Sequence, residues 1–112
     1  VYEHDLFPLI DFLEYCKTKE ISVLVLNIPR VEGLNQTKYF QSVTPAIRET
    51  VTSFPNAKYM EFAQMDYARN LFSESIHYNN AGEKKLNSDF KNQVYPEIIS
   101  YIKSLEKGLH EK

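Results

Sequence analysis

The chain has one cysteine, three histidines, three glycines and no tryptophan among its 112 residues. A single cysteine, Cys16, excludes an internal disulfide and a cysteine-based metal cluster, and three scattered histidines cannot complete a zinc-finger type of site. We therefore expect no metal and no cofactor. The glycines are not clustered, so no glycine-rich loop is available to cradle phosphates, which disfavours a nucleotide-binding domain of the flavodoxin kind.

The sequence also lacks an excess of charge of one sign and any long apolar run. Its 13 Lys and Arg residues stand against 15 Asp and Glu residues, and the two signs are interspersed. This pattern offers no basic surface for nucleic acid and no polybasic patch for anionic lipid. The longest apolar stretch, around residues 23–26, is far shorter than the roughly 18 to 20 residues that span a bilayer. We expect no nucleic-acid partner and no membrane segment.

The length allows one hydrophobic core, so residues 1–112 are interpreted as a single domain. The chain begins at Val1 rather than at methionine and shows no signal-peptide pattern. We therefore expect that the natural N-terminus was removed and that the chain is part of a longer protein.

The N-terminal part predicts a helix followed by a buried strand. Residues 5–19 have apolar side chains at helical spacing, with Asp5 as the N-cap and Pro8 in the first turn. Residues 21–28 form a nearly continuous, β-branched run, which is typical of a strand covered on both faces in a parallel sheet. Pro29 is expected to end that strand, with a loop over residues 30–37. The predicted core-facing stripe of the helix is Leu6, Leu9, Ile10, Leu13 and Cys16.

Further elements alternate along the rest of the chain. Helical spacing over residues 40–54 is interrupted at Pro45, which either kinks the helix or restarts it with Thr44 as its cap. Residues 57–62 predict a second strand, and residues 63–76 an irregular loop. Asn80 and Glu83 have the form of a capping box before a helix from residue 81. Pro96 is expected to break that helix and start a last one, whose inner face is Ile98, Ile99, Ile102 and Leu105.

This order of elements indicates an α/β domain. Strands separated by a helix pair in parallel through right-handed crossovers, with helices on both faces of the sheet. A sheet of only two strands leaves open edges, so a missing upstream segment or another chain is expected to supply further strands. The uncovered edge also makes self-association a prediction for the isolated chain.

The candidate catalytic residues lie where the loop at residues 63–76 meets the next helix. This position is at the carboxyl end of the sheet, where open α/β sheets bind their ligands. Glu74, three residues before His77, can turn back to accept a hydrogen bond from Nδ1–H and leave Nε2 free as a base. Asp66 is a weaker substitute for Glu74. Alternatively, His77 is a plain polar residue before a helix, and Glu74 is a solvated loop acid. Arg30, at the end of the first strand, is a candidate contact for an anionic substrate group.

The segment around His77 resembles the last block of the SGNH, or GDSL-like, hydrolase superfamily. That block runs Asp-x-x-His, often followed by x-Asn-x-x-Gly and a helix; His77, Asn79 and Gly82 match it, and Glu74 stands where the family usually has Asp. The two predicted strands also look like the penultimate and final strands of that fold. The resemblance thus covers nearly the whole chain and implies the C-terminal portion of a three-layer α/β/α domain with a parallel, flavodoxin-like sheet.

The resemblance implies a serine esterase or acyltransferase acting on an acyl ester of a small molecule or carbohydrate. His77 would be the catalytic base, oriented by Glu74 or Asp66. No serine here follows Gly or Asp, so the nucleophile and the oxyanion hole would lie outside this chain, which would be inactive alone. Family members often act outside the cytoplasm, so the resemblance also points to an extracytoplasmic location. The alternative of another class is a noncatalytic α/β domain that binds or scaffolds.

Overall fold

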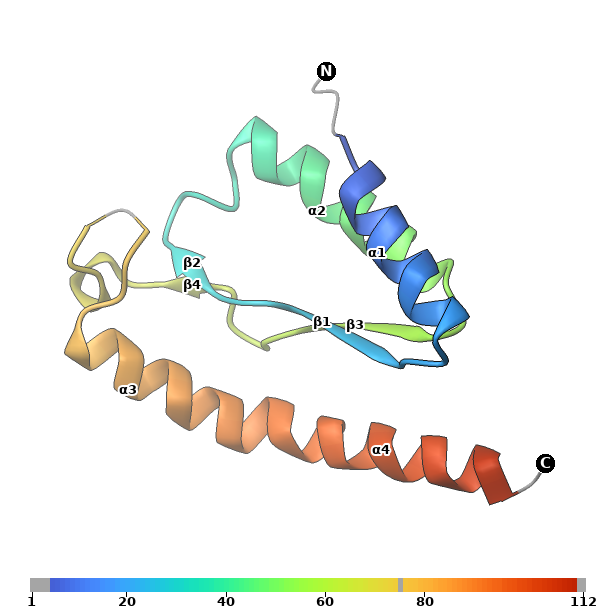
Figure 1. Cartoon of the computed structure of the whole chain (residues 1–112). Helices are drawn as coiled ribbons and strands as arrows, with labels where there is room; N and C mark the ends of the chain where they lie inside the picture. Colours follow the sequence, from blue (N-terminus) through green and yellow to red (C-terminus); the bar gives the residue numbers. More distant parts are fainter. Residues whose placement is uncertain (1–4, 75, 111–112) are drawn as a thin grey trace.

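The computed structural model of the chain describes residues 5–74 and 76–110 (Figure 1). Its first sheet consists of strands β1 (Val23–Asn27) and β3 (Ala57–Glu61), which pair in parallel with Val25 opposite Tyr59. Helix α2 (Lys38–Thr52) lies between them in the sequence, as a parallel crossover requires. The predicted parallel pairing is confirmed, and the chain is a mixed α/β protein.

A second parallel pair was not predicted. Strand β2 (Arg30–Val31) pairs with β4 (Asp66–Tyr67), so the expected loops over residues 30–37 and 63–76 each contain a short strand. Pro29 lacks an N–H and interrupts the ladder. Pairing then resumes, because the Arg30 N–H donates to the Met65 carbonyl at 2.9 Å and the Glu32 N–H to the Tyr67 carbonyl at 2.8 Å.

Helices cover both faces of the β1–β3 sheet. Alternate strand residues point to opposite faces, which separates the core into two clusters. On one face, α1 (Phe7–Thr18) and α2 bury Leu13, Val51 and Phe54 against Val23 and Val25. On the other, α3 (Asn80–Asp89), η2 (Phe90–Val94) and α4 (Tyr95–His110) form one long helical arm (Figure 1). The second cluster contains Met60, Phe62 and Val94, with Leu24 and Leu26 from β1.

The first two helices follow the predicted periodicity but differ at their caps. Leu6, not Asp5, occupies the N-cap of α1, and the Asp5 carboxylate instead accepts from the Phe7 N–H at 3.1 Å. Helix α2 is a single helix that contains Pro45, and Thr37 caps it by accepting from the Phe40 N–H. Thr44 is therefore not a cap.

The C-terminal helical arm differs from the sequence-based prediction in three respects. Asn79, not Asn80, caps α3. Pro96 does not break the arm, which continues as one helical ribbon from α3 into α4 (Figure 1). The wider π-helical turn η2 precedes Pro96 and accommodates a residue without an N–H. Ile102 and Leu105, predicted to face the core, are 46% and 36% exposed, since α4 extends past the short sheet that it covers.

The molecule is more extended than a compact domain of its length. Its radius of gyration is 16.1 Å, whereas about 13 Å is usual for a domain of some 100 residues. Two short strands carry long helices on both faces, and several large apolar side chains remain exposed; these include Phe7, Phe12, Tyr95 and Ile102. Within residues 5–74 and 76–110, none of the helices combines the length and the apolar character needed to cross a membrane.

Candidate functional site

His77 lies on a closed loop at the carboxyl end of the parallel strands. We call residues 72–78 the His77 loop. An antiparallel bridge between Phe72 and Tyr78 closes it, and the Ser73 N–H donates to the His77 carbonyl at 2.8 Å. The loop lies beyond the ends of β2 and β4, where η1 (Arg69–Leu71) leads into it and α3 leaves it (Figure 1). This is the predicted position for a ligand site of an α/β sheet.

Aromatic contacts hold the two ends of the His77 loop, Phe72 and Tyr78, together. The rings of Phe72 and Tyr78 stack with centroids 4.9 Å apart, and Tyr67 contacts Tyr78 edge-on. The Tyr78 hydroxyl donates to the Pro29 carbonyl oxygen, in the linker between β1 and β2. A tyrosine hydroxyl is protonated at neutral pH and can donate, and burial raises the pKa of Tyr78 further. The loop is therefore fixed to the sheet through its last aromatic residue.

Asn79, at the start of α3, fixes the helix against the segment that precedes the His77 loop. Asn79 Oδ1 accepts from the Gly82 N–H at 2.9 Å, and Asn79 Nδ2 donates to the Asn70 carbonyl at 2.8 Å. A Cβ at position 82 would lie 2.0 Å from the Leu71 carbonyl oxygen. The close approach of the helix to η1 thus requires glycine at this position. Asn79 and Gly82 have the structural roles that their residue types suggest.

The loop brings together the two main predicted site residues. His77 Nδ1 is in hydrogen-bond contact with Glu74 Oε1, so the predicted contact is present. The side chains are 67% and 60% exposed, and a pair this exposed contributes at most about 1 kcal/mol to stability. Among the described residues, Nε2 has no hydrogen-bond partner, and the Ser73 hydroxyl bonds to the His77 carbonyl at 3.2 Å rather than to the ring.

Asp66 and Arg30 are placed away from that contact. The Asp66 carboxylate accepts from the side-chain amides of Asn35 and Gln36, each at 3.1 Å, and is therefore not the partner of His77. Arg30 donates from Nη1 to Asn35 Oδ1 at 3.0 Å, and its guanidinium stacks 4.3 Å from the centre of the Phe40 ring. Arg30 is thus built into the wall of the site.

An apolar hollow of about 300 Å³ adjoins the His77 loop. Its lining includes Ile76 and Tyr78 from the His77 loop and Pro29 and Leu34 from the segment that follows β1. Phe40, with the Arg30 guanidinium on its ring, also lines the hollow. The hollow is thus lined by Ile76 and Tyr78, the residues on either side of His77 in the sequence.

A second hollow, the polar pocket, shares Phe40 with the apolar hollow in its lining and has a volume of about 260 Å³. It opens where the β1–β3 ladder ends and α2 passes over the sheet. Its polar lining consists of Asn27, Asn35, Gln41, Thr44, Arg48, Glu61 and Asp66, and its apolar lining is Phe40, Pro45 and Met65.

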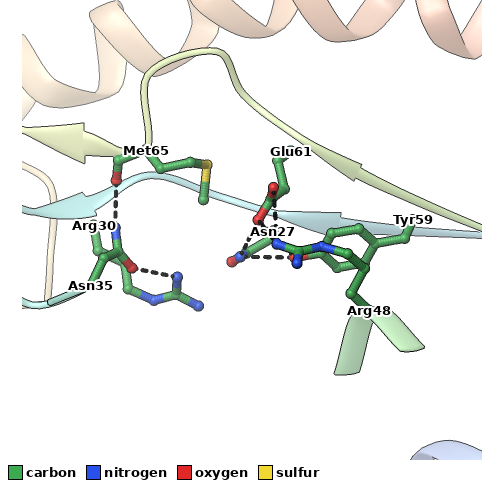
Figure 2. A network of polar contacts seen from close by, with 7 residues as sticks. All are labelled: Asn27, Arg30, Asn35, Arg48, Tyr59, Glu61 and Met65. Carbon is green, nitrogen blue, oxygen red and sulfur yellow. Dashed lines mark hydrogen bonds and ion pairs between the residues drawn. The ribbon is translucent and has the colours of Figure 1, made fainter. Parts of the chain in front are cut away.

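A hydrogen-bond network organises the floor of the polar pocket (Figure 2). Glu61 accepts from the Tyr59 hydroxyl at 3.0 Å, from Asn27 Nδ2 at 3.3 Å and from Arg48 Nη2 at 3.4 Å. Asn27 Nδ2 also contacts the Tyr59 hydroxyl at 3.0 Å. Burial, followed by the neighbouring Glu61 carboxylate, raises the pKa of Tyr59.

Sequence reasoning did not identify this pocket, because its residues come from β1, β3, β4, α2 and two loops. The available signal was the position of Asn27 and Glu61, one at the end of each strand. As for metals, residues 5–74 and 76–110 contain no group of three or more His, Cys, Asp or Glu side chains placed to hold an ion. No protein-family model, no curated protein and no solved structure matches the chain.

Proposed function

We propose that this chain is the C-terminal part of an SGNH-like serine hydrolase or acyltransferase, in which His77 is the general base and Glu74 orients it. In this proposal an upstream segment adds parallel strands to the β1–β3 sheet, completing a three-layer domain. The same segment supplies the nucleophilic serine and the oxyanion hole. The substrate is an acyl ester of a small molecule or carbohydrate.

The proposed reaction uses both nitrogens of the imidazole. As the serine oxygen attacks the acyl carbonyl carbon, His77 Nε2 takes the hydroxyl proton, and the carbonyl π electrons move onto oxygen. His77 then returns the proton to the departing alcohol oxygen as the ester C–O bond breaks. Water, or an acceptor alcohol, attacks the acyl-serine in the same way. Throughout, the Glu74 carboxylate holds Nδ1–H and stabilises the imidazolium.

The contact between His77 Nδ1 and Glu74 is the observation that carries the proposal. It lies on a loop anchored by backbone and aromatic contacts, and it leaves Nε2 directed away from its carboxylate partner. Because both side chains are exposed, the contact contributes little to fold stability. The extended shape and the open sheet edges support the idea of an additional segment.

Hydrolysis of 4-nitrophenyl acetate by the longer natural protein tests this function. We expect His77→Ala to lower kcat/KM by at least about 10³-fold, because loss of a triad member removes most of the catalysis. Glu74→Gln should lower it less than His77→Ala does. Glu106→Gln, which removes an exposed carboxylate of α4, is the matched control and should leave the rate unchanged. An unaltered rate in folded His77→Ala would refute the proposal.

A noncatalytic binding domain is the second candidate. The observation that favours it is the exposure of His77, with no hydroxyl of a described residue placed against Nε2. This candidate predicts that the longer protein has no esterase activity and that His77→Ala changes nothing but the local surface. The same assay therefore separates the two candidates.

A further inference from the structure

We propose that the polar pocket binds a neutral polyhydroxylated ring of monosaccharide size. The proposal goes beyond the esterase function, because it concerns a separate pocket that neither His77 nor Glu74 lines and it does not require His77 chemistry. Its volume, about 260 Å³, lies just below the roughly 300–1,000 Å³ of pockets that take drug-sized ligands. A single small ring is therefore the appropriate size of ligand.

The charged groups of the pocket are already compensated by partners within the protein. Glu61 accepts from Tyr59, Asn27 and Arg48, as Figure 2 shows. Asp66 accepts from the amides of two loop residues. An anionic ligand would meet both carboxylates, and a cationic one would meet the Arg48 guanidinium. The pocket therefore disfavours ions of either sign and favours a neutral ligand.

The uncompensated polar groups match hydroxyls. The Gln41 amide and the Thr44 hydroxyl line the pocket from α2, and each can both donate and accept. Pro45 has no N–H, so the helical hydrogen bond to the Gln41 carbonyl is not formed. Arg48 contacts Glu61 through Nη2, and its guanidinium carries further N–H donors. Hydroxyl groups suit this mixture because they also donate and accept.

The apolar part of the lining fits the C–H face of such a ring. Phe40 and Met65 present an aromatic and a thioether surface to the pocket, which can cover apolar ligand surface while the polar groups fix orientation. Phe40 is itself held by the Arg30 guanidinium at 4.3 Å, and Arg30 by Asn35 (Figure 2). The aromatic wall is thus positioned before any ligand enters, which lowers the entropic cost of binding.

Amide NMR titration of the longer natural protein, followed at the amides of this chain, tests the proposal directly. The neutral probes are the methyl glycosides of glucose, galactose, mannose and N-acetylglucosamine; the charged probes are glucuronate and glucosamine, and cyclohexanol is the apolar probe. We expect at least one neutral glycoside to shift the amides of Asn27, Gln41 and Thr44 with a millimolar Kd. The charged and apolar probes should bind more weakly.

Two variants with matched controls localise the binding. Gln41→Ala and Thr44→Val should each raise the Kd about 3- to 10-fold, the effect of losing one hydrogen bond. Asn87→Ala, on the exposed surface of α3, and Thr52→Val, at the exposed end of α2, should leave it unchanged. His77→Ala should also leave it unchanged, so failure of the esterase proposal would not be mistaken for failure of this one.

Three results would overturn the inference. If no neutral glycoside shifts these amide resonances at concentrations well above millimolar, the pocket is not a binding site for such ligands. Tighter binding of glucuronate or glucosamine would contradict the neutral ligand class. A Kd unaffected by both Gln41→Ala and Thr44→Val would place the binding elsewhere.

Discussion

The Tyr78 hydroxyl donates a hydrogen bond to the carbonyl oxygen of Pro29, and this bond ties the end of the His77 loop to the linker between β1 and β2. The two residues are 49 positions apart in the sequence. Because Tyr78 directly follows His77, the anchor determines where the imidazole stands relative to the carboxyl edge of the sheet. The apolar hollow lies between the loop and this linker.

Removal of this anchor should loosen the loop without unfolding the protein. Tyr78→Phe retains the stacking on Phe72 but loses the hydrogen bond, so we expect the free energy of unfolding to fall by about 1 kcal/mol. Urea denaturation followed by circular dichroism measures the change. Tyr95→Phe, at a ring that is 53% exposed, is the control and should be neutral. Equal stability of both variants would show that the Tyr78 hydroxyl is not an anchor.

Two glycines in helices should respond oppositely to alanine. At Gly82 the new Cβ would lie 2.0 Å from the Leu71 carbonyl oxygen, so Gly82→Ala should cost about 1–3 kcal/mol through overpacking. Gly108 in α4 has nothing within 4 Å of a built Cβ, and Gly108→Ala should be neutral or stabilise by up to about 1 kcal/mol through helix propensity. Thermal denaturation of the two variants checks the sign of each effect. A harmless Gly82→Ala would contradict the close approach of α3 to η1.

Alkaline pH should destabilise the fold through Tyr67. This side chain is fully buried, and its hydroxyl donates to the Asp89 carboxylate. Burial, reinforced by Asp89, raises the pKa of Tyr67. Above about pH 10 the unfolded tyrosine loses its proton while the folded one retains it, so the unfolded state binds fewer protons. The free energy of unfolding must then fall as pH rises above about 10.

Urea denaturation from about pH 8 to about pH 11 measures this slope. Tyr67→Phe should flatten it, although Tyr59 and Tyr78, whose pKa values are also raised by burial, leave a residual slope. Tyr95→Phe should keep the full slope. A Tyr67→Phe variant with the wild-type slope would show that another group controls alkaline stability.

The sequence predicted those parts of the fold that depend on regular periodicity. The spacing of apolar residues predicts helix α1, with Leu13 and Cys16 facing the core. It also predicts the parallel strands β1 and β3. The β2–β4 pair could not be predicted in this way. It joins Arg30 to Asp66 across 36 positions, and its two-residue strands carry no pattern of their own.

The candidate site was likewise predictable only in part. The contact between Glu74 and His77 is local, since a three-residue separation in a loop brings the side chains together. The polar pocket is not local: Asn27, Arg48 and Glu61 meet only because β1, α2 and β3 pack together. Asp66 was a plausible partner of His77 by residue type, but the β2–β4 pairing places it against Asn35.

The isolated chain should associate with itself or be only marginally stable. Among the described residues, β1 and β3 each pair on one side only, so the sheet has an open edge on each side. A shallow groove of about 430 Å³ is lined by residues 58–63 together with Gln93 of η2 and Glu97 of α4. Sedimentation velocity at several concentrations should show concentration-dependent species, or thermal denaturation a low Tm. A strict monomer that melts above about 70 °C would indicate that the domain needs no further strands.

Covalent labelling of the longer natural protein with a fluorophosphonate tests the central claim most directly, because this probe reacts only with an activated serine. The account predicts one labelled serine outside this chain, mapped by peptide mass spectrometry, and loss of labelling in His77→Ala with the fold intact by circular dichroism. The Glu106→Gln control should be labelled like the wild type. Absence of a labelled serine, or labelling that persists in folded His77→Ala, would contradict the assignment of His77 as the base of a serine hydrolase.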